Sequence, residues 1–187
     1  MIHLLLTSVR AGKLTVGAFY GHPGVFAYPS HESIRRARAE GYKARMLPGI
    51  SAEDCLFADL NIDPAQTGCQ SYEATDFLLN SRQIDNSSQL ILWQIGVLGD
   101  TTFKAQGYDF QGAMPYLLEK LNRYYSPSHL VYVYEAATIA GAEAVVHQVP
   151  LWSLGQSPLT SASTLYVPPA RSSESDPYFA SRVPLRS

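Results

Sequence analysis

The stretch that decides the fold class is VGAFYGHPGVFAYPSH, residues Val16–His31. Its apolar part belongs to a short run from Leu14 to Tyr20, and such a run is typical of a strand that is covered on both faces. The run ends in Gly-His-Pro-Gly, and Ser30 then stands where a helix N-cap is expected. A strand, a glycine-rich turn and a capped helix in this order favour an α/β fold.

Segments with the pattern of strands and helices alternate over most of the chain. The expected strands are residues 14–20, 43–47, 70–72, 90–96, 130–137, 145–149 and 163–169. The expected helices are residues 2–12, 30–40, 51–60, 73–80 and 113–125. Gly12 and Gly41 stand where the first two helices should end. This alternation predicts an α/β architecture with mostly parallel or mixed sheets, in which ligands bind beyond the carboxyl ends of the strands.

The polar stretch NSRQIDNSSQ, Asn80–Gln89, is rich in turn formers and is the best candidate for a domain boundary. We therefore expect one α/β domain over residues 1–82 and a second over residues 83–170. Residues 171–187 are polar without periodicity, so we expect a poorly ordered tail. The first expected strand follows a helix that has no earlier strand to cross over from, so the sheet of the first half looks incomplete.

The bulk composition excludes several classes of protein. With 46% hydrophobic and 16% charged residues, the chain has a globular composition, and its net charge of -2 predicts no general affinity for nucleic acid or anionic membranes. No apolar stretch approaches the roughly 18 residues of a membrane span, and the start does not resemble a signal peptide, so we expect a cytoplasmic protein. Cys55 and Cys69 are expected as buried free thiols, and the scattered histidines give no metal-ligand spacing.

The Gly-His-Pro-Gly turn has features of a ligand-binding loop. No Lys-Ser/Thr pair follows the glycines and no G-x-G-x-x-G is present, which argues against a polyphosphate loop. Because Gly21 and Gly24 have no Cβ, the backbone can approach a ligand closely, and Pro23 stiffens the turn. The turn suits a ligand held by main-chain groups and shape. A tight strand–helix connection without a ligand fits these residues equally well.

The motifs FYGHPGVF, ARMLPGISAEDCLFADL, YEATDFL and STLYVPP together resemble a known family. They are similar to the tetrapyrrole methylase superfamily and, within it, most similar to the borosin (omphalotin-type) peptide α-N-methyltransferases. The resemblance runs from about Met1 to Pro169, and GHP stands where corrin and porphyrin methylases typically have GDP. It implies two α/β subdomains with S-adenosylmethionine in the cleft between them. It also implies methylation of the backbone amides of a peptide.

By motif position, the resemblance implies cofactor contacts at strand ends and in the loops beside them. The implied contact residues are Tyr20, His22, Val25, Ala52, Gln94, Ala136, Ser163 and Thr164. Tyr20 would place an aromatic face beside the sulfonium cation, an interaction worth about 1 kcal/mol. For His22 taken alone, without the family, a structural role would be the more common one.

Two departures from the family pattern bear on catalysis and substrate. In borosin enzymes a glycine-rich strand and a segment with catalytic tyrosines and an arginine precede the helix that opens this chain, so the catalytic residues are expected upstream of Met1 and stay unknown. A late start assignment, a fragment and a shortened natural relative each account for this. Omphalotin-type enzymes carry their substrate peptide at the end of the same chain, whereas residues 171–187 have no apolar repeat. We therefore expect a peptide substrate supplied in trans, and the family pattern implies a homodimer.

Other functions stay open at this point. The enzyme alternative is a tetrapyrrole methyltransferase, which fold kinship favours and GHPG does not. The non-enzyme alternative is an S-adenosylmethionine-binding module without catalysis. Ser51 is better explained as a helix cap than as a nucleophile, since no G-x-S-x-G surrounds it, and Glu53 and Asp54 are first-turn carboxylates that favour the helix dipole.

Overall fold

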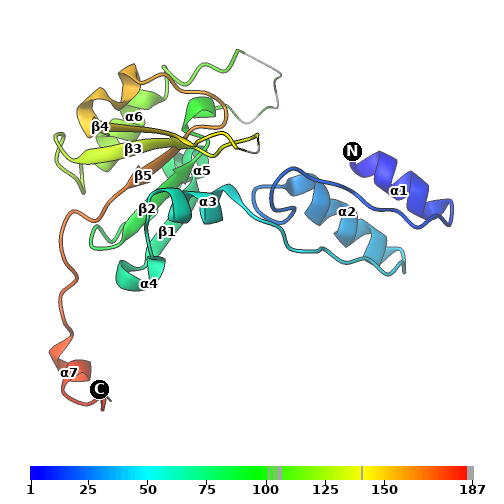
Figure 1. Cartoon of the computed structure of the whole chain (residues 1–187), viewed down its shortest axis with the longest axis horizontal. Helices are drawn as coiled ribbons and strands as arrows, with labels where there is room; N and C mark the ends of the chain where they lie inside the picture. Colours follow the sequence, from blue (N-terminus) through cyan, green and yellow to red (C-terminus); the bar gives the residue numbers. More distant parts are fainter. Residues whose placement is uncertain (101, 103, 105–106, 140, 185–187) are drawn as a thin grey trace. The chain divides into compact units, whose positions relative to one another are not determined.

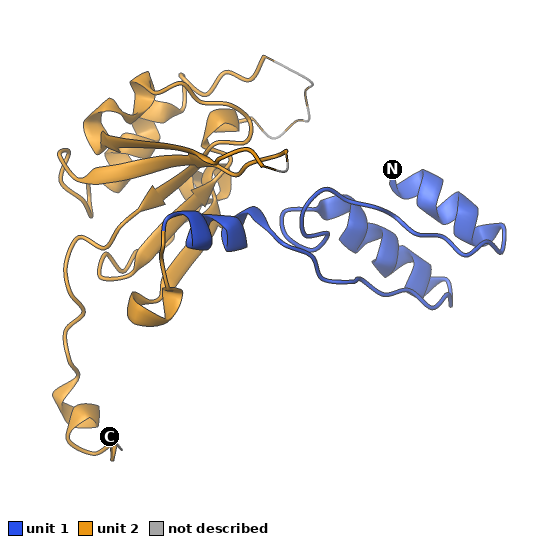
Figure 2. Ribbon diagram, viewed as in Figure 1, with its two compact units in different colours: residues 1–60 blue, residues 61–187 orange. Residues whose placement is uncertain are grey.

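The computed structural model describes residues 1–100, 102, 104, 107–139 and 141–184, and Figure 1 labels its helices and strands. The chain divides into two compact units, Met1–Leu60 and Asn61–Ser187, which are coloured separately in Figure 2 and described here one at a time. The expected boundary after residue 82 stays a prediction. The strands on either side of it, β1 (Cys69–Glu73) and β2 (Gln89–Trp93), pair in one sheet.

The first unit contains α1 (Ile2–Arg10), α2 (Tyr28–Ala39) and α3 (Ala52–Asp59). The first two helices pack against each other, and this packing buries Leu6 and Ala37. The Arg10 guanidinium donates two hydrogen bonds to the Glu40 carboxylate, at 2.8 and 2.5 Å, and so ties the two helix ends together. Gly12 and Gly41 follow these ends with φ of 75° and 86°, which confirms their expected role.

The start of α2 differs from the expectation. The helix begins at Tyr28 with Pro29 in its first turn, so Ser30 lies inside the helix and is not its N-cap. Proline is favoured there because its missing N–H would have no helical partner. The Ser30 hydroxyl instead hydrogen-bonds the carbonyls of Pro23 and Ala27, which holds the preceding loop against the helix.

The strands expected at residues 14–20 and 43–47 are wrong. Both segments are irregular, and Leu14 and Val16 are 98% and 83% exposed. An extended segment becomes a strand only when a neighbour satisfies its N–H and C=O groups. The described strands, which all lie between residues 69 and 167, pair with one another and with neither segment.

The second unit is built on a five-stranded sheet in the order β1-β2-β5-β3-β4. Its later strands are β3 (Leu130–Glu135), β4 (Val145–Pro150) and β5 (Thr164–Val167). β1 and β2 run parallel, and the other neighbouring pairs are antiparallel. The expected α/β class with a mixed sheet is therefore confirmed. The expected strands that overlap observed ones are residues 70–72, 90–96, 130–137, 145–149 and 163–169.

Helical segments cover one face of this sheet. Those that contribute to the core are α5 (Ala74–Leu79), η1 (Ile95–Val97), α6 (Met114–Leu121) and η2 (Leu151–Gln156). Two other short helices of this unit, α4 (Pro64–Thr67) and α7 (Pro177–Ala180), contain no buried residue. Alternate residues of the central strands face this core because side chains alternate along a strand. The strand residues in the core are Leu90, Leu92, Val131, Val133, Leu165 and Val167.

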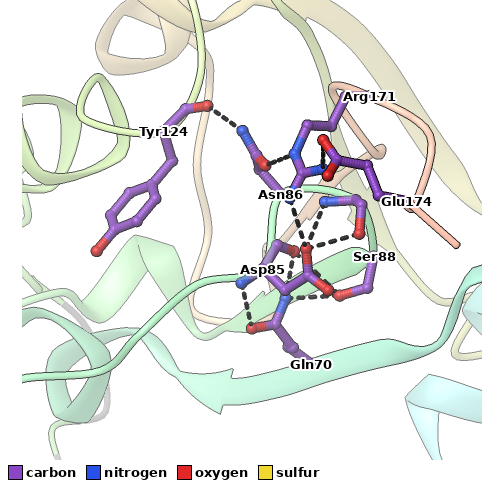
Figure 3. A network of polar contacts seen from close by, with 8 residues as sticks. Gln70, Asp85, Asn86, Ser88, Tyr124, Arg171 and Glu174 are labelled. Carbon is purple, nitrogen blue, oxygen red and sulfur yellow. Dashed lines mark hydrogen bonds and ion pairs between the residues drawn. The ribbon is translucent and has the colours of Figure 1, made fainter. Parts of the chain in front are cut away.

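A polar network anchors the chain where it leaves β5 (Figure 3). Asn86 donates to the Tyr124 carbonyl at 2.9 Å, and its side-chain oxygen accepts from Arg171 Nε at 2.8 Å. The backbone carbonyl of Asn86 also accepts from Ala170 at 2.8 Å. Beside it, the Gln70 amide donates to the Asp85 carbonyl at 2.8 Å. Within residues 171–184 beyond this anchor, the regular structure is the short helix α7.

Two further sequence expectations concern membranes and thiols. Among the residues that the structure describes, none of the helices combines the length and the apolar character that crossing a bilayer requires. Cys55 and Cys69 are not in a disulfide, as expected, but both are half-buried where full burial was expected.

Candidate functional site

The carboxyl ends of β2 and β3 meet the amino end of β5 at one edge of the sheet. Leu92 pairs with Leu165, and Tyr134 pairs with Thr164, which fixes the register at this edge. The structure therefore brings together the predicted contact residues of the second unit at the position where ligands of α/β sheets bind. These residues are Gln94, Ala136, Ser163 and Thr164.

Gln94 follows β2 directly and has an unusual backbone. Its φ of 62° and ψ of 38° lie in the left-handed region, which costs a residue other than glycine on the order of 1 kcal/mol. The side chain is exposed, whereas the residues on either side of it are buried. The left-handed turn thus directs an amide group out of the sheet edge, where it can donate and accept hydrogen bonds.

Ser163 and Thr164 are buried where β5 begins. The Ser163 carbonyl accepts from the Ile95 N–H at 3.0 Å, which connects the start of β5 to the turn that contains Gln94. The Ser163 hydroxyl accepts from the Thr160 N–H at 2.8 Å. These bonds close a turn, Thr160–Ser163, at the edge of the candidate site.

Sequence reasoning missed three residues that shape this edge: Glu135, Gly96 and Thr160. The Glu135 carboxylate accepts from the Thr160 hydroxyl at 2.6 Å and from the Ser163 hydroxyl at 2.5 Å. A Cβ on Gly96 would overlap the Thr160 carbonyl, so only glycine fits there. The available signal was a carboxylate at the very end of an apolar strand, which is a common place for functional groups in α/β sheets.

The first unit brings together the other predicted contact residues around the glycine turn. The Gly24 N–H donates to His22 Nδ1 at 2.9 Å, and the Val25 N–H donates to the His22 carbonyl at 3.2 Å. The His22 side chain thus accepts a hydrogen bond from the turn that follows it. Tyr20 is 78% exposed, so its ring is free to contact a ligand.

The turn that leads into α3 lies against the glycine turn. A Cβ on Gly49 would lie 2.9 Å from the Gly21 carbonyl oxygen, so the two backbones approach closely. Ala52, the remaining predicted contact residue, is the exposed first residue of α3. All the predicted contact residues of this unit thus lie on two adjoining turns.

Ser51 caps α3, as the sequence predicted. Its hydroxyl accepts from the Asp54 N–H at 3.2 Å, and Asp54 Oδ2 accepts from the Ser51 N–H at 2.7 Å, which forms a capping box. Hydrogen bonds from the Ser51 hydroxyl and N–H lower the pKa of Asp54 below its ordinary value. The structure thus explains Ser51 by its cap, without a role as nucleophile.

The described parts of the chain contain no group of three His, Cys, Asp or Glu side chains that could hold a metal ion. The polar groups at both candidate regions are amides, hydroxyls, backbone N–H and C=O groups, one phenol, the His22 imidazole and the Glu135 carboxylate. Such groups suit an organic ligand with hydrogen-bonding and apolar parts.

The chain matches a known protein family. The family described as Tetrapyrrole (Corrin/Porphyrin) Methylases matches residues 1–151. This chain belongs to the tetrapyrrole methylase family. The resemblance inferred from the sequence motifs is thereby confirmed.

Curated relatives of this tetrapyrrole methylase come from fungi. It is 45% identical over 173 residues to the methyltransferase/ribosomally synthesized cyclic peptide dendrothelin A precursor of Dendrothele bispora, covering 90% of this chain and 41% of that protein. It is 43% identical over 173 residues to the methyltransferase/ribosomally synthesized cyclic peptide omphalotin A precursor of Omphalotus olearius, with the same coverage of 90% and 41%. The chain thus spans about two-fifths of the length of these relatives.

Solved structures share the fold of this tetrapyrrole methylase. Uroporphyrin-III C-methyltransferase from Thermus thermophilus, complexed with S-adenosylhomocysteine, aligns with a TM-score of 0.61 at 17% identity, over 89% of this chain and 71% of that one. The methyltransferase CobJ aligns with a TM-score of 0.59 at 17% identity, over 92% and 71% of the two chains.

Proposed function

We propose that this tetrapyrrole methylase is part of an S-adenosylmethionine-dependent methyltransferase. The enzyme would add methyl groups to the backbone amide nitrogens of a peptide (α-N-methylation). The observation that carries the proposal is the convergence of Gln94, Ala136 and Ser163 at one edge of the sheet, where ligands of α/β proteins bind. The names of the relatives at 43–45% identity support it, since each joins a methyltransferase to a cyclic peptide precursor.

The residues present fit S-adenosylmethionine. When bound, this cofactor supplies an electrophilic methyl group on a sulfonium cation. Tyr20 offers an exposed aromatic face that favours a neighbouring cation, and the closely packed turns at Gly21 and Gly49 offer backbone groups. Gln94 offers an exposed amide for the polar parts of the cofactor. The contacts of His22, Val25, Ala52, Ala136, Ser163 and Thr164 with the cofactor are part of this proposal.

The proposed role of this chain in the reaction is to bind the methyl donor and to orient it toward the acceptor nitrogen. An amide nitrogen is a poor nucleophile, so its methylation needs a group that removes or displaces its proton. We assign no residue of this chain to that step. Holding the methyl donor and the acceptor nitrogen in line lowers the activation free energy. In well-oriented intramolecular reactions this effect amounts to about 7–11 kcal/mol.

The peptide acceptor is proposed as a separate chain. Residues 170–187, ARSSESDPYFASRVPLRS, are polar and have no apolar repeat that suits a cyclic peptide, so we do not propose these residues as the acceptor. A homodimer and a cytoplasmic location complete the proposal. Both rest on the family resemblance and on the composition, and neither changes the chemistry at the sheet edge.

Tetrapyrrole methylation is the second candidate, favoured by the family description and by the fold shared with uroporphyrin-III C-methyltransferase. Fold alone does not fix the acceptor, because one fold supports different substrates. The GHPG turn, in place of the GDP that is typical of tetrapyrrole enzymes, favours the peptide.

The test begins with calorimetric titration of S-adenosylhomocysteine into the 187-residue chain. We expect binding with one site per chain. Replacing Gln94 with alanine should weaken binding, whereas replacing the exposed Gln66 of α4 should not. A folded chain that fails to bind would contradict the cofactor assignment.

The acceptor is then identified by mass spectrometry. The chain is incubated with S-adenosylmethionine and either the precursor segment of the dendrothelin A relative or a uroporphyrin-III tetrapyrrole. Methyl groups added to the peptide backbone alone would support the proposal. Methyl groups added to the tetrapyrrole alone would replace it with the second candidate. Cofactor binding with no transfer to either acceptor would favour a binding module without catalysis.

A further inference from the structure

We propose that Glu135 is a positioning residue of the cofactor site, acting through the Thr160–Ser163 turn. This inference rests on the proposed function, because it assigns the turn to the binding of S-adenosylmethionine. Glu135 is the last residue of β3 and is half-buried. The resemblance to known enzymes gave it no role.

The Glu135 carboxylate fixes both hydroxyl groups of the turn with one oxygen atom. Oε1 accepts from the Thr160 hydroxyl at 2.6 Å and from the Ser163 hydroxyl at 2.5 Å. Both distances are typical of the short hydrogen bonds that a hydroxyl donates to an ionised carboxylate, which are about twice as strong as neutral ones. Each hydroxyl therefore has its proton directed at Glu135.

Backbone groups of the turn occupy the lone pairs of the same hydroxyls. The Thr160 N–H donates to Ser163 Oγ at 2.8 Å, and the Ala162 N–H donates to Thr160 Oγ1 at 3.1 Å. The two side chains are thus held as acceptors within the turn and as donors to Glu135. Removal of the carboxylate would leave both protons without this acceptor and allow the turn to relax.

The opposite side of the turn is held by the segment that follows β2. The Ile95 N–H donates to the Ser163 carbonyl, and the Thr160 carbonyl occupies the space where a Cβ of Gly96 would lie. The turn is therefore clamped between the ends of β2 and β3. Because Gln94 immediately precedes Ile95, a shift of the turn would change the positions of two predicted contact residues, Gln94 and Ser163.

The strand itself does not depend on Glu135. β5 is held by its register with β3 at Thr164, Leu165 and Tyr166, and by a second ladder with β2. Among the described residues, the hydrogen bonds that the structure gives the carboxylate go to the turn before the strand. Loss of Glu135 should therefore alter the shape of the binding edge more than the stability of the sheet.

The experiment compares affinity for S-adenosylhomocysteine with thermal stability in the 187-residue chain. Glu135→Ala should weaken binding about tenfold, since both hydroxyls of the turn lose a charged hydrogen-bond acceptor. Glu135→Gln keeps an acceptor oxygen in place and should restore affinity to within about threefold of the unaltered chain. Glu119→Ala is the matched control, because it removes an exposed carboxylate of α6 that forms an ion pair with Arg123.

Thr160→Val provides a second variant, which removes the hydroxyl that donates to Glu135 and accepts from the Ala162 N–H, with little change of side-chain shape. It should weaken binding about threefold while the chain stays folded, so the inference remains testable even if Glu135→Ala does not fold. Normal affinity in a folded Glu135→Ala or Thr160→Val chain would overturn the inference and leave the proposed function standing. A folded, unaltered chain that does not bind would overturn the proposed function, and the inference with it.

Discussion

Asn86 and Arg171 are joined by a hydrogen bond of 2.8 Å across 85 positions of sequence, and this bond holds the chain where it leaves the sheet (Figure 3). Arg171 also lies 3.7 Å from the carboxylates of Asp85 and Glu174. Because Asn86 bonds Tyr124 as well, one amide ties together the loop before β2, the end of α6 and the start of the tail. This edge is opposite to the one that carries the candidate site, since β2 begins here.

Replacing Asn86 with alanine should release the start of the tail. We expect a loss of about 1–2 kcal/mol in the free energy of unfolding, because two side-chain hydrogen bonds are removed. Cleavage by trypsin after Arg171 should also become faster, since the guanidinium loses its anchor. Urea denaturation and limited proteolysis measure the two effects. Asn122→Ala, at the exposed end of α6, serves as the control, and equal cleavage rates in both variants would refute the anchor.

Replacing Gly96 with alanine should destabilise the second unit. The new Cβ would overlap the Thr160 carbonyl, and overpacking of this kind costs about 1–3 kcal/mol. Gly112→Ala is a matched control, because a Cβ on Gly112 meets no atom within 4 Å. Thermal unfolding should show a lower midpoint for the first variant alone. Equal midpoints would mean that the turn can move away without cost.

Replacing Gln94 with glycine should separate stability from binding. Glycine adopts the left-handed conformation without strain, so the variant should be at least as stable as the unaltered chain. It lacks the exposed amide, so its affinity for S-adenosylhomocysteine should fall. Differential scanning fluorimetry with and without S-adenosylhomocysteine measures both quantities in one assay. A variant that is stabilised by the ligand as strongly as the unaltered chain would exclude Gln94 from the binding site.

The first unit should lose stability in acid through Glu32. Hydrogen bonds from Arg35 and Arg36 lower the pKa of the Glu32 carboxyl to about 2. The pKa of Glu32 in the folded chain lies below the ordinary value of about 4.3. The ionised carboxylate therefore contributes to the free energy of unfolding above that pH, and this contribution is lost as the pH falls toward about 2. Urea denaturation at several pH values should therefore show a steeper acid decline in the unaltered chain than in Glu32→Gln. Glu53→Gln, in the first turn of α3, is the control and should keep the steep decline.

Local sequence features predicted much of the second unit. The apolar runs at residues 90–96, 130–137 and 163–169 became β2, β3 and β5, because their alternating side chains pack into the core on one face of the sheet. The capping box at Ser51 and the glycine ends of α1 and α2 depend on neighbouring residues alone, so their prediction succeeded. Ser30 failed as a cap because Pro29, one position earlier, is a better residue for a first helical turn.

Sequence by itself determined the family, the mixed α/β class and the candidate contact residues, since these follow from motifs and from local patterns. Only the tertiary structure decided which extended segments are strands, because pairing depends on a neighbour: residues 14–20 have a strand's composition and no strand beside them among the described residues. Only the tertiary structure gave Glu135 its partners, Thr160 and Ser163. They lie 25 and 28 positions away in the chain and meet the carboxylate because β3 and β5 run antiparallel.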